Sequence, residues 1–362
     1  MLNVDKLYVK YHDRLVGTLM MSPDSESAVF QYADEWLATG FSISPLELPL
    51  QNKLFIAPRM PFYGNFGIFE DSLPDGYGRY LLNRILKAQG IDDFQLTPLQ
   101  RLSIIGSAGM GALCYEPANN PMEDAILPEL DELQQLALDV LSEKQTEGAD
   151  VLYFNSGNSG GCRPKCLLHE DGKDWLVKFR HTYDPKDIGE QEYHYMQLAK
   201  RCGIDIPESR LIQGKYFASQ RFDRTDTGER LHVATAAALL SESINPPRTD
   251  YKTILSLTGW LTQSPQQVEQ MFRRMVFNVL IQNKDDHAKN FSFIWQNGKW
   301  RLAPAYDLLP CIEGYHGQHA TSVMGSGNPT EQDMIAAGES IRINAKRAKQ
   351  IIEEIKSITE NP

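Results

Sequence analysis

A polar loop between a helix and a β-hairpin is the feature that most limits what this chain can fold into. The helix is expected from Ser264, an N-cap residue followed by proline, and from the apolar stripe along 265–281. The next residues, 283–290, read Asn-Lys-Asp-Asp-His-Ala-Lys-Asn, and a hairpin with an Asn-Gly turn is expected over 293–303. Apolar residues after the loop pull it inward, so its polar groups are held at the end of a helix, where functional side chains gather.

Composition and charge define the broad class of protein. A length of 362 residues suggests about two domains, and the balance of hydrophobic and charged residues is that of a globular chain. The net charge of −11 repels a phosphate backbone, so binding of nucleic acid without a helper protein is not expected. No apolar run reaches the ~20 residues of a membrane helix, and the first residues lack a signal-peptide pattern. We therefore expect a cytoplasmic protein without membrane contact.

Cysteine usage argues against two further classes. The five cysteines are scattered along the chain, which excludes a disulfide scaffold and fits a reducing compartment. Cys162 and Cys166 form the one close pair, and no histidine or second cysteine pair accompanies them to complete a zinc site. A structural metal centre is therefore not expected.

The order of the expected elements predicts an α+β protein in several parts. A proline- and acid-rich stretch at 116–129 is typical of a linker. Short strands are expected before it, at 7–9, 15–21, 46–50 and 55–57, and helices are expected at 77–87 and 130–141. Further strands are expected at 151–154, 166–169, 175–180, 210–212 and 216–222, with a helix over 190–202. Residues 230–281 are expected to be mostly helical, and the tail reads as an amphipathic helix.

The segment Ser156–Lys165, which we call the glycine loop, could bind an anion. Its glycines let backbone N–H groups approach a phosphate closely, and Lys165 adds a positive charge. An ordinary hairpin loop explains the same residues. Lys178 stands in an apolar strand, where an ammonium needs a partner such as Glu192, unless the strand lies at an edge and the lysine faces water.

Carboxylates in the polar loop and beyond it suit phosphoryl transfer. That reaction needs a carboxylate to accept the proton of the attacking hydroxyl and oxygen ligands for Mg²⁺. Asp285 and Asn290 fit these two roles, and Lys289 could neutralise the charge of the transferred group. A solvated charge run is the plain alternative. Asp307, alone in an apolar stretch, fits a second Mg²⁺ ligand or a helix N-cap.

These parts follow one another in the order found in protein kinases. That order is a glycine loop, a strand lysine, a helix glutamate, an aspartate with an asparagine five residues later, and an aspartate beyond a hairpin. The HRD and DFG spellings are absent, which excludes an ordinary eukaryotic-type kinase.

The chain resembles the HipA family of serine/threonine kinases, the toxins of bacterial type II toxin–antitoxin pairs. The matching C-terminal stretches are GGCRPK (160–165), WLVKF (175–179), QRFDR (220–224), DDHAKNFSF (285–293) and LAPAYDLLP (302–310). The N-terminal ones are EWLATGFSISPLELPL (35–50), DSLPDGYGR (71–79) and GSAGMGAL (106–113). The resemblance therefore covers nearly the whole chain.

This resemblance implies a two-lobed, protein-kinase-like α+β fold with a β-rich N-terminal subdomain and a mostly helical C-terminal lobe. The parts it implies are an N-terminal subdomain at 1–118, a linker and helix at 119–150, a kinase N-lobe-like part at 151–228 and a helical C-lobe at 229–362. The implied cofactors are ATP, bound between the lobes, and Mg²⁺.

The resemblance also implies roles for single residues. Asp285 and Lys289 become catalytic residues, and Asn290 and Asp307 become ligands of Mg²⁺. The residues implied to contact the nucleotide are Ser159, Gly160, Gly161, Cys162, Arg163, Pro164, Lys165, Lys178, Gln220, Arg221, Phe222, His287, Asn290, Tyr306 and Asp307. Family members carry an autophosphorylated serine in the glycine loop, for which Ser159 and Ser156 are the candidates here.

The implied partners are a HipB-like helix-turn-helix antitoxin, through which the chain would reach DNA indirectly, and a protein substrate. For the best-known members that substrate is an aminoacyl-tRNA synthetase, glutamyl-tRNA synthetase, and growth arrest follows. Two alternatives stay open: a nucleotide-binding pseudokinase acting as antitoxin scaffold or co-repressor, and a small-molecule kinase. Lys178, Asp285, Asn290 and Asp307 count against the first alternative, and the family-like N-terminal part counts against the second.

Overall fold

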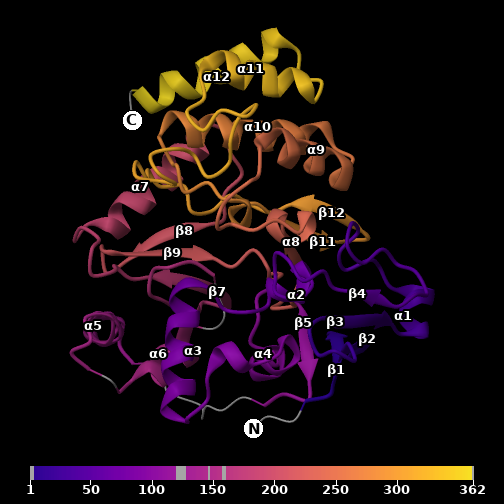
Figure 1. The fold of residues 1–362 in the computed structure, drawn as a ribbon. Coiled ribbons are helices and arrows are strands. Elements are labelled where there is room, and N and C mark those ends of the chain that lie inside the picture. The colour runs from indigo at the N-terminus through magenta and orange to yellow at the C-terminus, as the bar shows by residue number, and fades with distance from the viewer. Residues whose placement is uncertain (1–3, 120–127, 146, 157–159, 361–362) are drawn as a thin grey trace. The chain divides into compact units, whose positions relative to one another are not determined.

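The computed structural model describes residues 4–119, 128–145, 147–156 and 160–360. The chain divides into two compact units: unit 1 is Met1–Gly189 with Arg210–His232, and unit 2 is Glu190–Ser209 with Val233–Pro362. Figure 1 shows the elements of each unit. No helix within these described ranges is both long and apolar enough to cross a membrane.

Unit 1 begins with an antiparallel sheet of five strands (Figure 1). The strands are Lys6–Tyr11 (β1), Arg14–Met21 (β2), Ala28–Tyr32 (β3), Phe55–Ile56 (β4) and Leu113–Glu116 (β5), in the order β4-β3-β2-β1-β5. A tight turn joins β1 to β2, and His12 in this turn has a φ of 52°. Leu7 and Val9 alternate with exposed neighbours along β1, which places one face of the strand in the core.

Six helices belong to the described residues of unit 1. They are Asp34–Thr39 (α1), Gly67–Glu70 (α2), Gly76–Ala88 (α3), Pro98–Ile105 (α4), Leu130–Leu141 (α5) and Ala149–Ser156 (α6), with a 3-10 turn at Asp93–Gln95 (η1). Thr97 and Gln100 form a capping box at the start of α4, so two backbone N–H groups at this helix end are satisfied.

A second sheet carries the strand lysine. Its strands are Lys165–Glu170 (β6), Lys173–Lys178 (β7), Ser209–Ile212 (β8) and Tyr216–Gln220 (β9), in the order β6-β7-β9-β8. One hydrophobic core joins this sheet to α3, α5 and α6: Val177 of β7, Leu81 of α3 and Leu152 of α6 are all buried in it. A helix from the N-terminal part of the sequence therefore packs on the sheet that holds Lys178.

Unit 2 is mostly helical. Its helices are Ile188–Arg201 (α7, whose first two residues belong to unit 1), Ala236–Leu240 (α8), Tyr251–Thr262 (α9), Pro265–Leu280 (α10), Glu331–Ser340 (α11) and Ala345–Glu360 (α12). A three-stranded sheet has the order β10-β11-β12, with the strands His232–Thr235 (β10), Ser292–Gln296 (β11) and Lys299–Leu302 (β12). Ser264 caps α10 by accepting a hydrogen bond from the N–H of Gln267, and Pro265 opens the helix.

Most of the elements expected from the sequence are confirmed, including α3, α5, α10, α12 and the hairpin of β11 and β12. The strand expected at 151–154 is wrong, because these residues lie in α6. The strand expected at 46–50 is also wrong: a turn closed by a bridge between Ser44 and Leu48 takes its place. The helices α1 and α4 were not expected from the sequence.

Candidate active site

The polar loop of unit 2 exposes one aspartate and buries the next. The side chain of Asp285 is 60% exposed, whereas that of Asp286 is fully buried. The loop lies between α10 and a single 3-10 turn at Ala288–Asn290 (η2). The two adjacent carboxylates therefore have different surroundings: that of Asp286 lies in the core, and that of Asp285 is open to solvent.

Three groups from elsewhere in unit 2 bind the buried carboxylate of Asp286. The hydroxyl of Tyr251 lies 2.8 Å from Asp286 Oδ2, and His319 Nδ1 lies 2.8 Å from the same oxygen. The backbone N–H of Thr321 donates to Asp286 Oδ1 at 3.2 Å. Burial, together with the neighbouring Asp286 charge, raises the pKa of Tyr251 well above its ordinary value. The hydroxyl therefore stays protonated and donates a hydrogen bond to Asp286.

Asn283 and Tyr306 join the polar loop to the segment that carries Asp307. The amide of Asn283 donates to the Asp307 carbonyl oxygen at 3.0 Å and to Asn278 Oδ1 at 3.1 Å. The hydroxyl of Tyr306 donates to the Lys289 carbonyl oxygen at 2.7 Å. The structure therefore brings the predicted residues 285–290 together with Tyr306 and Asp307 in unit 2.

A buried arginine of α10 holds the backbone of the segment that leads to Asp307. Arg274 of α10 is 2% exposed and donates to the Ala303 carbonyl oxygen at 2.6 Å. The N–H of Ala305 donates to the Asp205 carbonyl oxygen at 2.8 Å. Asp307 itself has a φ of 54°, a left-handed conformation that a non-glycine residue adopts only where its surroundings impose it.

The polar loop and the segment after it carry oxygen atoms of the kind that Mg²⁺ binds. The amide nitrogen of Asn290 donates to the Asp285 carbonyl oxygen at 2.9 Å, and this hydrogen bond fixes which way the amide oxygen Oδ1 points. An amide oxygen and the Asp307 carboxylate are hard ligands of the kind that Mg²⁺ takes from protein while it keeps waters or phosphate oxygens. His287 Nε2 lies 3.9 Å from Asp285 Oδ1, at the edge of the same loop.

Unit 1 holds residues 160–165 of the glycine loop and the strand lysine side by side. Lys165 and Lys178 face each other across β6 and β7, and the Pro164 carbonyl oxygen accepts a hydrogen bond from the N–H of Phe179 at 2.8 Å. Lys178 is half-buried, with its ammonium 5.6 Å from the centre of the Phe217 ring. Lys165 is 5% exposed, and its ammonium donates to the Gly160 carbonyl oxygen, inside the loop that it was expected to close.

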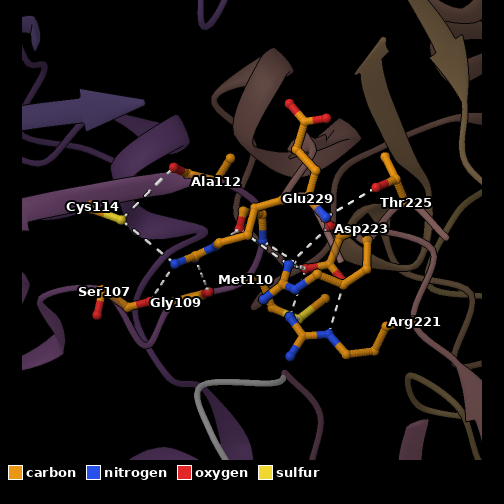
Figure 2. Close-up of polar contacts among 12 residues, drawn as sticks. Ser107, Gly109, Met110, Ala112, Cys114, Arg221, Asp223, Thr225 and Glu229 are labelled. Carbon is orange, nitrogen blue, oxygen red and sulfur yellow. Dashed lines mark hydrogen bonds and ion pairs between the residues drawn. The ribbon is translucent and has the colours of Figure 1, made fainter. Parts of the chain in front are cut away.

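Two arginines expected near the nucleotide form ion pairs within unit 1. Arg163 makes two hydrogen bonds to Asp184, at 2.9 and 3.1 Å. Arg221 makes two to Asp223, at 2.8 and 2.7 Å, as Figure 2 shows. The backbone N–H of Arg221 donates to the Asp174 carbonyl oxygen at 2.8 Å. Both guanidiniums thus serve neighbouring carboxylates in this structure.

Asp223, which lies in the QRFDR stretch but was not predicted as a site residue, is the centre of a buried cluster. Its side chain is 1% exposed and also pairs with Arg224 at 2.9 Å. It accepts a hydrogen bond from the Gly111 N–H at 2.9 Å. Burial alone would raise the pKa of Asp223, but the two arginines and the Gly111 amide outweigh it and lower this pKa to about 2. The carboxylate is therefore ionised and joins β9 to the loop before β5.

Arg230 binds the same loop through its backbone. Its guanidinium donates to the carbonyl oxygens of Ser107 at 2.6 Å, Gly109 at 2.8 Å and Gly111 at 2.7 Å. Arg230 was not predicted, because its three acceptors are backbone atoms more than a hundred residues away. The glycine-rich stretch 106–113 thus offers backbone carbonyl oxygens to Arg230 and, at Gly111, also to Arg224.

Two domain models of one protein family match the chain. Residues 157–361 match the model of the HipA-like C-terminal domain, which spans more than half of the chain, and residues 7–116 match that of the HipA N-terminal domain. The chain belongs to the HipA family. The resemblance inferred from the motifs is thereby confirmed.

Individual HipA-family relatives are distant. "Putative kinase Y4dM" of Sinorhizobium fredii is 32% identical over 164 residues, which are 40% of this chain and 39% of that protein, so the chain matches less than half of that relative's length. The serine/threonine-protein kinase toxin HipA of Shewanella oneidensis is 22% identical over 333 residues, 82% of this chain and 73% of that protein.

A solved HipA structure has the same fold. The structure of the Shewanella oneidensis toxin–antitoxin complex of HipA, HipB and operator DNA matches with a TM-score of 0.73 at 20% identity, over 98% of this chain and 90% of that one. The expected fold class is confirmed: an α+β, HipA-like kinase fold with a β-rich N-terminal region and a helical C-terminal part.

The remaining HipA-motif positions lie as follows. Ser156 ends α6 and is buried, with its hydroxyl donating to the Tyr153 carbonyl oxygen at 3.0 Å, and Ser159 lies outside the described residues. Cys162 is exposed, and its Sγ accepts a hydrogen bond from Tyr183 at 3.9 Å. Gln220 and Phe222 are half-buried at the end of β9.

Proposed function

We propose that this HipA-family chain is an ATP-dependent serine/threonine protein kinase and the toxin of a type II toxin–antitoxin pair. One arrangement carries the proposal: Asp285 is exposed on a loop whose Asn290 and neighbouring Asp307 supply oxygen ligands in the same unit. The names of the relatives support kinase activity. The cytoplasm is the proposed place of action.

In this proposal each polar residue has a separate task. Asp285 accepts the proton of the attacking hydroxyl, and Lys289 offsets the charge of the transferred group. Asn290 and Asp307 hold Mg²⁺, which when bound supplies positive charge to the phosphates. Lys178 and the residues of the glycine loop bind the phosphates, while Gln220, Arg221, Phe222, His287 and Tyr306 line the nucleotide.

The test is the substitution Asp285→Asn. It keeps the size of an exposed side chain, so melting temperature and circular dichroism should not change. Transfer of labelled phosphate should fall at least about 100-fold, because general-base catalysis contributes that much or more. Asp226→Asn, at an exposed turn of unit 1, is the matched control and should keep full activity. Undiminished transfer by Asp285→Asn would refute the assignment of the base.

Binding and transfer assays of the wild-type chain distinguish this proposal from its two alternatives. Binding of Mg-ATP without transfer to any protein would favour a nucleotide-binding scaffold or co-repressor. Transfer to a metabolite but to no protein would favour a small-molecule kinase. Labelling of one or a few cellular proteins, an aminoacyl-tRNA synthetase among them, is the expected result.

Autophosphorylation in the glycine loop is part of the proposal. Ser159 and Ser156 are the candidates, and Ser156 would have to leave the Tyr153 carbonyl and the core before it could react. Mass spectrometry of the peptide 151–165 after incubation with Mg-ATP tests this. The Ser159→Ala and Ser156→Ala variants assign the position, and an unmodified peptide in the active wild-type enzyme would contradict it.

A HipB-like helix-turn-helix antitoxin is the proposed partner. The relative of known structure was solved with HipB and operator DNA. A chain with a net charge of −11 is poorly suited to hold DNA alone. In a gel-shift assay we expect this chain to bind operator DNA only together with such an antitoxin. A shift produced by the chain alone would contradict this division of labour.

A further inference from the structure

The glycine loop is bonded to the first turn of α3 in both directions. The backbone N–H of Gly161 donates to Asp75 Oδ1 at 2.6 Å, and the N–H of Tyr77 donates to the Gly161 carbonyl oxygen at 3.1 Å. Asp75 is the N-cap residue of α3, yet its side chain makes no capping bond to its own helix. The carboxylate binds the loop instead.

The contact leaves no room for side chains on either partner. A Cβ on Gly76 would lie 2.5 Å from the Gly161 carbonyl oxygen, and one on Gly160 would lie 3.0 Å from Asp75 Oδ1. Gly161 has a φ of 97°, which a residue with a side chain rarely adopts. The backbone at the start of α3 therefore lies directly against the backbone of Gly161, with no side chain between them.

The same helix also supports the segment before the loop. Helices α3 and α6 pack against each other through one core, and they run side by side in Figure 1. Helix α6 ends at Ser156, and the Gly160 carbonyl oxygen is hydrogen-bonded to Lys165 at the start of β6. Helix α3 therefore contacts the chain at two places: at α6, directly before the glycine loop, and at Gly161, within it. A helix of the N-terminal part is thereby in contact with Gly160 and Gly161.

We infer that Asp75 is a positioning residue for the nucleotide. Its carboxylate fixes Gly161 and so holds the backbone amides of residues 160–165 of the glycine loop in the arrangement that binds the phosphates of ATP. The inference rests on the proposed kinase function. It gives the N-terminal part of the chain a task in nucleotide binding, although Asp75 itself does not touch the nucleotide.

The experiment measures the affinity for a non-hydrolysable ATP analogue with Mg²⁺ by calorimetry, together with hydrogen exchange of the peptide 160–168 without nucleotide. Asp75→Ala should weaken binding about tenfold, the effect of one charge-assisted hydrogen bond, and should speed exchange in that peptide. Asp75→Asn keeps an acceptor oxygen, so it should weaken binding less. Arg79→Ala, one turn further along α3, removes an ion pair to Asp93 and should change neither quantity.

Each outcome decides between the positioning role and its rivals. Unchanged affinity in Asp75→Ala with a wild-type chain that binds the analogue would overturn the role of Asp75 and leave the kinase proposal intact. Tighter binding would also overturn it, because the carboxylate would then compete with phosphate for the Gly161 amide. A wild-type chain that does not bind the analogue would overturn the kinase proposal, while faster exchange in Asp75→Ala would still report the contact. If Asp75→Ala does not fold, the near-isosteric Asp75→Asn decides by the same two measurements.

Discussion

The carboxylate of Asp286 lies 2.8 Å from Nδ1 of His319, and neither side chain is more than 3% exposed. The hydroxyl of Thr321 also donates to the Asp286 carbonyl oxygen, at 2.5 Å. Side chain and backbone of Asp286 are thus both held by the segment at 319–321. Because Asp285 directly precedes this anchor, its exposed carboxylate starts from a fixed backbone, which is what a positioned base requires.

Removal of His319 should loosen that anchor. His319→Ala leaves the buried Asp286 carboxylate with one donor fewer, which should cost about 2 kcal/mol of the free energy of unfolding. Phosphate transfer should fall as well, since the polar loop is no longer held. Urea denaturation and a transfer assay provide the two measurements. The control is His316→Ala, an exposed histidine three residues earlier, and equal stability of the two variants would show that the anchor contributes nothing.

Substitution of the proposed magnesium ligands should change the metal requirement of the reaction. Asn290→Ala removes an amide oxygen, and Asp307→Asn replaces a charged carboxylate with a neutral amide, so half-maximal transfer should need at least about tenfold more Mg²⁺. Chelation with EDTA should abolish transfer by the wild type. The measurement is a magnesium titration at saturating ATP, with Asp226→Asn as a control for the loss of one negative charge. An unchanged midpoint in both variants would remove these residues from the metal site.

Helices with strong local signals could be predicted from the sequence, and short apolar runs could not. Helix α10 has a serine cap, a proline in its first position and an apolar stripe, which all agree. The four apolar residues Val151–Phe154 fit a strand or a buried helix equally well, and packing of α6 against α3 decides for the helix. Leu48 lies in a turn, and its carbonyl oxygen accepts a hydrogen bond from the Tyr32 hydroxyl, a contact that no local sequence pattern reveals.

In the candidate site, too, some residues could be predicted from the sequence and others could not. Asp285, Asn290 and Asp307 stand out because polar residues in apolar surroundings need a reason to be there, and the structure brings their segments together. The groups that hold them were missed. Asp286 finds His319 33 residues away, and Asp223 finds Gly111 112 residues away, so only the folded chain shows these pairs.

Neutralisation of Asp223 should destabilise unit 1. Asp223→Asn leaves Arg221 and Arg224 largely buried without their carboxylate, which should cost about 3 kcal/mol, since a broken buried ion pair leaves uncompensated charge. Urea denaturation measures the loss. Asp226→Asn changes an exposed carboxylate three residues later and should stay within about 0.5 kcal/mol of the wild type. A similar small effect for Asp223→Asn would mean that the cluster does not support the fold.

His232 should make unit 1 sensitive to mild acid. The side chain is 1% exposed, and Nε2 lies 2.8 Å from the Ile43 carbonyl oxygen. Burial lowers the pKa of His232 to about 4, against the smaller opposing effect of the Ile43 hydrogen bond. The folded state therefore keeps this ring neutral where the unfolded chain, with its ordinary pKa of about 6.5, already takes up a proton.

The sign of the effect follows from this difference in proton binding. Between pH about 6.5 and about 4 the unfolded state binds more protons, so the free energy of unfolding decreases as the pH is lowered, by about 3 kcal/mol for this group. His232→Asn removes the titrating ring and should flatten the pH profile by that amount, measured by urea denaturation from neutral pH to about pH 4. His169→Asn, at a side chain 68% exposed, should keep the wild-type slope. If the profile of His232→Asn stays parallel to that of the wild type, the buried ring does not cause the acid sensitivity.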